Sequence, residues 1–115
     1  MTMDYKVSLV RCESYDAAQV QAAVAEAVRL LGGIGRFVKP GEKVLLKPNL
    51  LTDAPPEKGV DTHPEVVRAV IRLLRPVTRH IVCGDSPSVW GEKKDVNRVY
   101  EVSGIKKVCA EEGVE

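Results

Sequence analysis

The sequence predicts an α/β fold: a three-layer, Rossmann-like parallel sheet with flanking helices. Short apolar segments alternate with longer amphipathic ones in the order strand–helix–strand–helix–strand–helix, which is typical of parallel sheets with right-handed crossovers. The segment Val44-Leu45-Leu46 is apolar at consecutive positions, as are strands buried on both faces of a parallel sheet. Three strands make a thin sheet, so we expect residues 1–115 to be a single α/β domain and an incomplete fragment of a larger one.

Composition and charge limit the classes of function. The chain has 115 residues, of which 44% are hydrophobic and 29% charged, as in an ordinary soluble domain. Its formal net charge of +1 gives no overall attraction to nucleic acid or to an anionic membrane. There is no basic-then-apolar leader at the amino terminus, and no apolar segment approaches the ~20 residues of a membrane helix. We therefore predict a cytoplasmic protein with neither nucleic acid nor membrane as a partner.

The cysteines point to no cluster or metal. Cys12, Cys83 and Cys109 are widely spaced, and no Cys-x-x-Cys occurs, so we predict no iron–sulphur cluster ligands within this chain. Buried small thiols in a reducing compartment are the expected reading, Cys83 included.

The first half of the chain predicts two strands and a helix between them. Residues 5–11 alternate and are rich in Val and Leu, which indicates the first strand. Asp16 is placed to cap a helix over residues 17–31, whose apolar side chains recur on one face, as in a helix lying on a sheet. Pro40-Gly41 supplies a turn before the central strand, residues 43–47.

A long loop and a second helix follow the central strand. Residues 51–61 contain Pro55-Pro56 and are numerous enough for a functional loop. Thr62 and Glu65 have the spacing of a capping box, and Pro64 suits the first turn of a helix. The arginines of that helix are predicted to form a solvated face; these are Arg68, Arg72 and Arg75.

The last part of the chain predicts a third strand and two helices. Residues 80–83 form the strand, which ends in Gly84-Asp85-Ser86-Pro87 and leads to a loop with Trp90. Asp95 is placed to cap a helix through Val102, and another helix covers residues 105–112. Residues 113–115 resemble a turn that leads into a further strand.

Polar side chains converge at the carboxyl ends of the predicted strands, where open α/β sheets bind ligands. We expect one rim to hold the candidate ligand-binding residues Lys47, Asn49, Thr62, His63, Asp85 and Ser86. The amino, amide and hydroxyl groups among them, with the free N–H groups of the second helix, suit an anion such as phosphate or carboxylate.

Other readings of the same residues stay open. Asp85 and His63, with Asp61, offer oxygen and nitrogen ligands to a divalent metal instead. Each residue also has a purely structural reading: Thr62 as a helix cap, His63 as a helix-start residue, Asp85 in an Asx turn and Lys47 as a side chain reaching from a strand end to water. The cofactor and the catalytic residues, if there are any, stay unknown at this level.

Three motifs together resemble a known family. They are Val44-Leu45-Leu46-Lys47-Pro48-Asn49-Leu50, Thr62-His63-Pro64-Glu65-Val66-Val67-Arg68-Ala69-Val70 and Gly84-Asp85-Ser86-Pro87. In this order and spacing, over nearly the whole chain, they resemble domain-of-unknown-function family 362. Its signature positions correspond to Lys47, Pro48, Asn49, Thr62, His63, Pro64, Gly84, Asp85 and Ser86.

The resemblance implies a prokaryotic, cytoplasmic α/β domain that often stands beside ferredoxin-like iron–sulphur modules. It implies no particular reaction. Members of the family extend well beyond this length, so the chain resembles their amino-terminal part.

Two functions follow as hypotheses. In the first, the rim holds an anionic ligand or a metal, with Lys47 and Asn49 orienting it, Asp85 as metal ligand or acid–base group and His63 as proton carrier. In the second, the chain is a scaffold or docking domain that partners a ferredoxin-like module, the remainder of the domain or a second copy in a homo-oligomer.

Overall fold

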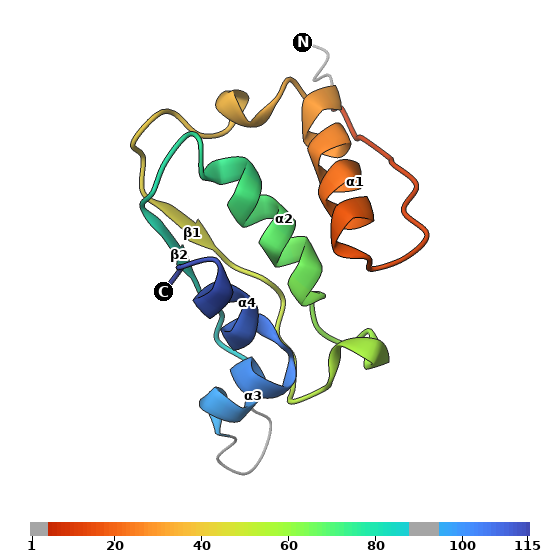
Figure 1. The fold of residues 1–115 in the computed structure, drawn as a ribbon, viewed down its shortest axis with the longest axis vertical. Coiled ribbons are helices and arrows are strands. Elements are labelled where there is room, and N and C mark those ends of the chain that lie inside the picture. Colours follow the sequence, from red (N-terminus) through yellow and green to blue (C-terminus); the bar gives the residue numbers. More distant parts are fainter. Residues whose placement is uncertain (1–4, 88–94) are drawn as a thin grey trace.

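The computed structural model of the chain describes residues 5–87 and 95–115. It has mixed helices and strands (Figure 1), in this order: α1 (Ala17–Leu30), the 3₁₀ turn η1 (Ile34–Arg36), β1 (Val44–Leu46), the 3₁₀ turn η2 (Pro56–Lys58), α2 (Pro64–Leu74), β2 (Ile81–Cys83), α3 (Val96–Val102) and α4 (Ile105–Glu111). All four predicted helices are confirmed. The loop residue Trp90 lies outside the described residues.

Side-chain caps explain where two of the helices begin. A carboxylate oxygen of Asp16 accepts a hydrogen bond from the backbone N–H of Gln19 at 3.1 Å, at the start of α1. Asp95 accepts in the same way from the N–H of Asn97 at 3.0 Å, at the start of α3. Each carboxylate satisfies a donor that has no partner inside its helix, so both predicted caps are confirmed.

The cap predicted for α2 is wrong. His63, not Thr62, is the N-cap, because the His63 Nδ1 atom accepts the N–H of Glu65 at 3.1 Å. The His63 ring also stacks on Tyr15, with centroids 3.7 Å apart and an interplanar angle of 4°. Thr62 is engaged elsewhere: its N–H donates to the carbonyl of Asn49, and its hydroxyl accepts the Asn49 N–H, both at 2.9 Å. The hydroxyl is therefore used to hold a loop rather than a helix.

Two strands form the sheet in the described part of the chain. β1 and β2 are parallel, in the register Val44↔Ile81, Leu45↔Val82 and Leu46↔Cys83. Val44, Leu46 and Cys83 pack against the core, whereas the side chains of Leu45 and Val82 point to the other face and are 65% and 47% exposed. Helices thus cover one face of this sheet. The described residues make two layers, and the predicted three-layer arrangement is not found among them.

Residues 5–11 do not form the strand that was predicted. They are extended but unpaired with β1, and the side chains of Val7 and Leu9 are 89% and 94% exposed. Figure 1 shows the segment beside α1 and apart from β1. Alternation in the sequence favours the local conformation, but a strand also needs a neighbouring edge within hydrogen-bonding distance, and β1 does not offer one to this segment.

The core lies between the sheet and helices α2, α3 and α4. Ile71 of α2 is fully buried at its centre. The buried cluster consists of Leu50, Val67, Ile71, Leu74, Ile81, Val99, Ile105, Val108, Cys109 and Val114. α1 packs mainly on α2 rather than on the sheet, with Val20 buried and the Gln21 side chain donating to the Ala69 carbonyl at 3.5 Å.

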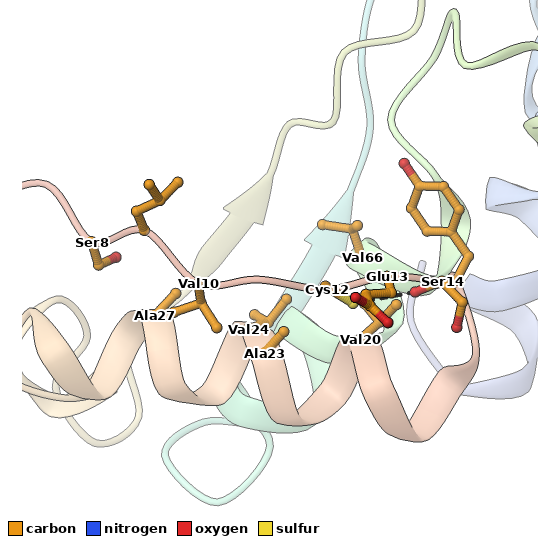
Figure 2. A pocket seen from close by; sticks show the side chains of 12 residues that line it. Ser8, Val10, Cys12, Glu13, Ser14, Val20, Ala23, Val24, Ala27 and Val66 are labelled. Carbon is orange, nitrogen blue, oxygen red and sulfur yellow. Dashed lines mark hydrogen bonds between the residues drawn. The ribbon is translucent and has the colours of Figure 1, made fainter.

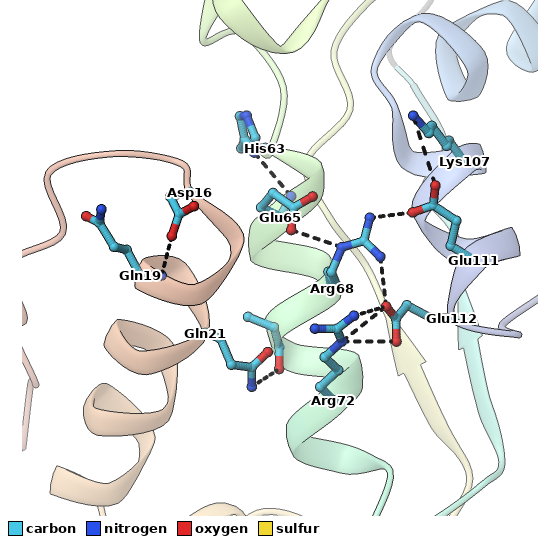
Figure 3. A network of polar contacts seen from close by, with 11 residues as sticks. Asp16, Gln19, Gln21, His63, Glu65, Arg68, Arg72, Lys107, Glu111 and Glu112 are labelled. Atoms are coloured by element: carbon cyan, nitrogen blue, oxygen red, sulfur yellow. Dashed lines mark hydrogen bonds and ion pairs between the residues drawn. The ribbon is translucent and has the colours of Figure 1, made fainter.

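Ion pairs join α2 to the end of α4, as Figure 3 shows. The Arg68 guanidinium lies 2.5 Å from Glu111 and 2.8 Å from Glu112, and its side chain is only 14% exposed. Arg72 also pairs with Glu112 at 2.8 Å, and Arg75 donates to the Glu112 carbonyl. The predicted solvated arginine face is therefore wrong: the arginines form an interface with acidic residues that are distant in the sequence.

Candidate functional site

The carboxyl ends of β1 and β2 bring two charged residues together. Lys47 follows the last residue of β1, and Asp85 lies two residues beyond β2. Because the strands are parallel and in register, both ends open at the same edge. The Lys47 Nζ atom lies 2.5 Å from the Asp85 Oδ1 atom, and the side chains are 65% and 6% exposed respectively. The pair thus places an accessible ammonium group on a nearly buried carboxylate.

Asp85 is tied to three parts of the fold. Its Oδ2 atom accepts the backbone N–H of Leu50 at 3.0 Å. Its own N–H donates to the Tyr100 hydroxyl at 2.8 Å, and that hydroxyl donates to the Asp85 carbonyl at 2.7 Å. The hydrogen bond from Lys47, followed by that from Leu50, holds the pKa of the Asp85 carboxyl below its ordinary value. Asp85 is therefore an ionised anchor for the loop after β1, for Lys47 and for α3.

A second carboxylate holds the next part of the same loop. The Asp61 Oδ1 atom accepts the N–H groups of Leu51 and Thr52 at 2.6 and 3.3 Å. The two preceding backbone N–H groups also donate to side chains, that of Asn49 to Thr62 and that of Leu50 to Asp85. The backbone N–H groups of residues 49–52 thus all have side-chain acceptors. The Asp61 Oδ2 atom is buried and accepts no hydrogen bond from the described residues. An acceptor of this kind is normally satisfied by a water molecule or a ligand donor.

The remaining predicted site residues have different environments. Asn49 and Ser86 are exposed at the rim. His63 is partly buried against Tyr15, and burial lowers the pKa of its imidazole below the ordinary value. A cavity of about 170 Å³ lies beside the rim between β1 and α2, lined by Leu46, Lys47, Pro48, Thr62, Val66, Val67 and Val70. The rim therefore combines exposed hydrogen-bond donors with a small apolar recess.

The side chains predicted as metal ligands already have partners within the protein. In the part of the chain that the structure describes, no group of three or more His, Cys, Asp or Glu side chains is placed to hold one. Asp85 is engaged by Lys47 and by Leu50, while the Nδ1 atom of His63 accepts the Glu65 N–H. These contacts engage both carboxylate oxygens of Asp85 and one ring nitrogen of His63, the two residues predicted as a metal pair.

Sequence reasoning did not assign the anchoring roles of Asp61 and Tyr100. Asp61 stands at the end of a Pro-rich loop, and Tyr100 lies on one turn of a short helix. Neither position has a local signal for its partner, because the partners are backbone groups 10 and 15 residues away. Sequence reasoning also did not predict the ion pair between Arg98 of α3 and Asp53 at 2.8 Å, which joins the loop of residues 51–61 to α3.

The fold and the rim define an α/β domain with a polar edge at the strand ends, and comparison places it in a family. Residues 44–115 match the family described as domain of unknown function (DUF362), and the chain belongs to this family. The match starts at the first residue of β1 and includes all six rim residues. Residues 1–43 lie outside it, so the resemblance covers less of the chain than was predicted.

The chain is also similar to part of a longer protein from Synechocystis sp.. Over 82 residues the chain is 48% identical to the thylakoid-associated protein sll1697 of Synechocystis sp.. The aligned segment is 71% of this chain and 26% of the relative, so the chain spans about a quarter of the relative's length. No solved structure matches the chain. None of the helices in residues 5–87 and 95–115 has the length and apolar character needed to cross a membrane.

Proposed function

We propose that the chain is a ligand-binding domain whose rim holds a small anion, such as a phosphate or carboxylate group, through Lys47, Asn49 and Ser86. The observation that carries this proposal is the Lys47–Asp85 pair: the carboxylate fixes the ammonium group at 2.5 Å, yet leaves its side chain 65% exposed. An ammonium has three donors, so Lys47 keeps donors for a ligand while its position is held. Asn49 and Ser86 place an exposed amide and hydroxyl at the same edge.

Thr62 and His63 support this rim indirectly. Thr62 holds the backbone of Asn49 by two hydrogen bonds, and His63 starts α2 immediately afterwards. Because Asp85 offsets the charge of Lys47, we expect the ligand to be held largely by hydrogen bonds, and binding to weaken only moderately as salt rises.

Titration of the chain with inorganic phosphate, followed by amide chemical shifts in NMR, tests the proposal. We expect shifts confined to residues near 47–50 and 85–86, and about tenfold weaker binding for Lys47→Gln, the loss of one charge-assisted hydrogen bond. Lys43→Gln is the matched control, since Lys43 lies before the opposite end of β1; it should bind as the natural chain does. Equal phosphate binding by the two variants would refute an anion site at Lys47. Parallel titration with Mg²⁺ and Mn²⁺ tests the metal alternative at Asp85 and His63.

A second candidate function is docking of a ferredoxin-like iron–sulphur module. The bare sheet face favours it, because Leu45 and Val82 are exposed side by side in one register pair and exposed apolar patches often mark contact surfaces. Covering this face would also add the third layer of a Rossmann-like fold. A purified bacterial-type ferredoxin is the probe: Val82→Asp should abolish binding measured by light scattering, and Leu30→Asp, at an exposed leucine of α1, should not. Unchanged binding in Val82→Asp would exclude this face.

For the cellular location we propose the cytoplasm. Three free cysteines, one of them exposed, suit a reducing compartment. The name of the relative associates that protein with thylakoids, which makes peripheral attachment to a membrane the alternative. Fractionation of cells that express the chain distinguishes the two, since a cytoplasmic protein stays in the supernatant at low salt.

A further inference from the structure

An apolar hollow lies between the extended amino-terminal segment and the helices α1 and α2. A cavity of about 470 Å³ is lined on one side by residues 8–10 and 12–15 and on the other by side chains of α1 and α2. Figure 2 shows Val20, Val24 and Ala27 on the face of α1 that is turned toward this segment. Val66 of α2 lines both this cavity and the smaller one beside Leu46 of β1. Val66 therefore stands between the hollow at the amino-terminal segment and the recess beside the first strand.

The edge of β1 that faces away from β2 has unpaired backbone groups. The N–H of Val44 donates to His80, and the carbonyl of Leu46 accepts from Gly84, so these two residues bond toward β2. In a parallel ladder the residue between them points its N–H and C=O to the opposite edge. That residue is Leu45, for which the described residues supply no partner. An unpaired strand edge is a template for another strand.

The other edge of the sheet is already extended by main chain. The N–H of Cys83 in β2 donates to the carbonyl of Glu115 at 2.7 Å. Over residues 5–87 and 95–115 the sheet has two strands of three residues each, fewer than the four to six strands that sheets commonly have. The radius of gyration is 15.3 Å, against about 13 Å for a compact domain of this length, which agrees with an open hollow beside the amino-terminal segment.

We infer that the hollow receives an added β-strand that lies between residues 5–11 and β1 and pairs with the free edge at Leu45. Its apolar side chains pack on Val24 and Ala27 of α1 and on Val66 of α2. Residues 7–11 then pair with its far edge, which turns this extended segment into a strand of one continuous sheet. The added strand supplies both the missing hydrogen-bond partners and the missing apolar contacts.

The occupant we assign is a strand from the part of the longer family proteins that the matched segment does not include. The aligned 82 residues are only 26% of the Synechocystis relative, so such proteins carry much further chain that is able to supply a strand. The inference is independent of the anion-binding rim, because the strand pairs with the edge of β1 and touches the helices rather than the Lys47–Asp85 pair.

Co-expression of the chain with a polypeptide made of the relative's residues outside the matched segment tests this assignment. We expect a one-to-one complex by light scattering, and at least tenfold slower hydrogen exchange at the Leu45 amide and in residues 7–11 of the complex. Ala27→Lys, in the hollow, should weaken the complex at least tenfold. Ala18→Lys is the matched control, because it makes the same change at an exposed position of the same helix, and it should leave the complex intact.

Three results would overturn the inference. The first is that no complex forms although circular dichroism shows the chain to be folded. The second is a complex in which the Leu45 amide exchanges as fast as in the isolated chain, since the partner would then bind elsewhere. The third is a dimer of the chain that protects Leu45 and is broken by Ala27→Lys, which would make a second copy the occupant.

Discussion

The ammonium group of Lys47 and the carboxylate of Asp85, from the ends of two different strands, are in direct contact at 2.5 Å. The same carboxylate accepts the N–H of Leu50, so one nearly buried side chain fixes the cation, the loop after β1 and the end of β2 together. Asp85, which was predicted as a metal ligand or acid–base group, thus stabilises the fold around the rim. Substitution of Asp85 should therefore affect folding as well as binding.

We expect Lys47→Met to make the protein unfold at a higher pH during acid titration. Asp85 has a lowered pKa in the folded state, chiefly through Lys47, so it contributes stability above the ordinary value of about 3.9, and this is lost as pH falls through the folded pKa. Without Lys47 the folded pKa rises toward the ordinary value, so the stability is lost at a higher pH than in the natural chain. Circular dichroism against pH measures the midpoint. Lys43→Met should leave it unchanged, and an equal shift in both variants would contradict the role of Lys47.

His63 should make stability depend on pH near neutrality. Burial lowers the pKa of His63 in the folded state, so stability is complete above the unfolded value of about 6.5 and falls as pH drops below it. Protonation of Nδ1 would also remove the acceptor for the Glu65 N–H. His63→Asn keeps a capping side chain and should flatten the free energy of unfolding between pH 7 and 5, measured with urea. His80→Asn, at an exposed position, should keep the slope; the same slope in both variants would argue against His63.

The ion-pair network between α2 and α4 should stabilise the fold more than a surface pair does. Glu112 is 13% exposed and contacts both Arg68 and Arg72, and the hydrogen bond from Arg72 holds its pKa below the ordinary value. We expect Glu112→Gln to cost about 1–3 kcal/mol, the cost of leaving charged partners poorly satisfied. Glu101→Gln breaks an exposed pair with Lys106 and should cost less than about 1 kcal/mol. Urea unfolding compares the two, and equal costs would mean that the network is merely a surface feature.

One thiol should react much faster than the others. Cys12 is exposed, whereas burial raises the pKa of Cys83 to about 12 and also raises that of the buried Cys109. Only the thiolate is nucleophilic, so at pH 8 we expect one rapid equivalent with Ellman's reagent and two more after unfolding. Cys12→Ser should remove the rapid phase, and Cys109→Ser should keep it. Three rapid equivalents in the folded protein would show that the core around Cys83 is open.

Local signals predicted the helices and part of the rim. Asp16 and Asp95 act on backbone groups two or three residues away, so their caps follow from the sequence. Parallel strands in register bring their carboxyl ends to one edge, so the nearness of Lys47 and Asp85 was also predictable. It was not predictable that His63 caps α2 while Thr62 holds the loop. These roles depend on Tyr15 and Asn49, which come close only in the folded chain.

The sequence by itself determined the helices, the parallel direction of β1 and β2 and the set of polar residues at their ends, because these follow from capping, periodicity and chain order over short distances. Only the tertiary structure decided which partners those residues have. Asp85 and Asp61 anchor a loop, Arg68 joins two helices, and residues 5–11 form no strand with β1. Such outcomes depend on which backbone donors, opposite charges and strand edges come within about 3 Å, and that distance is set by the packing of elements far apart in the sequence.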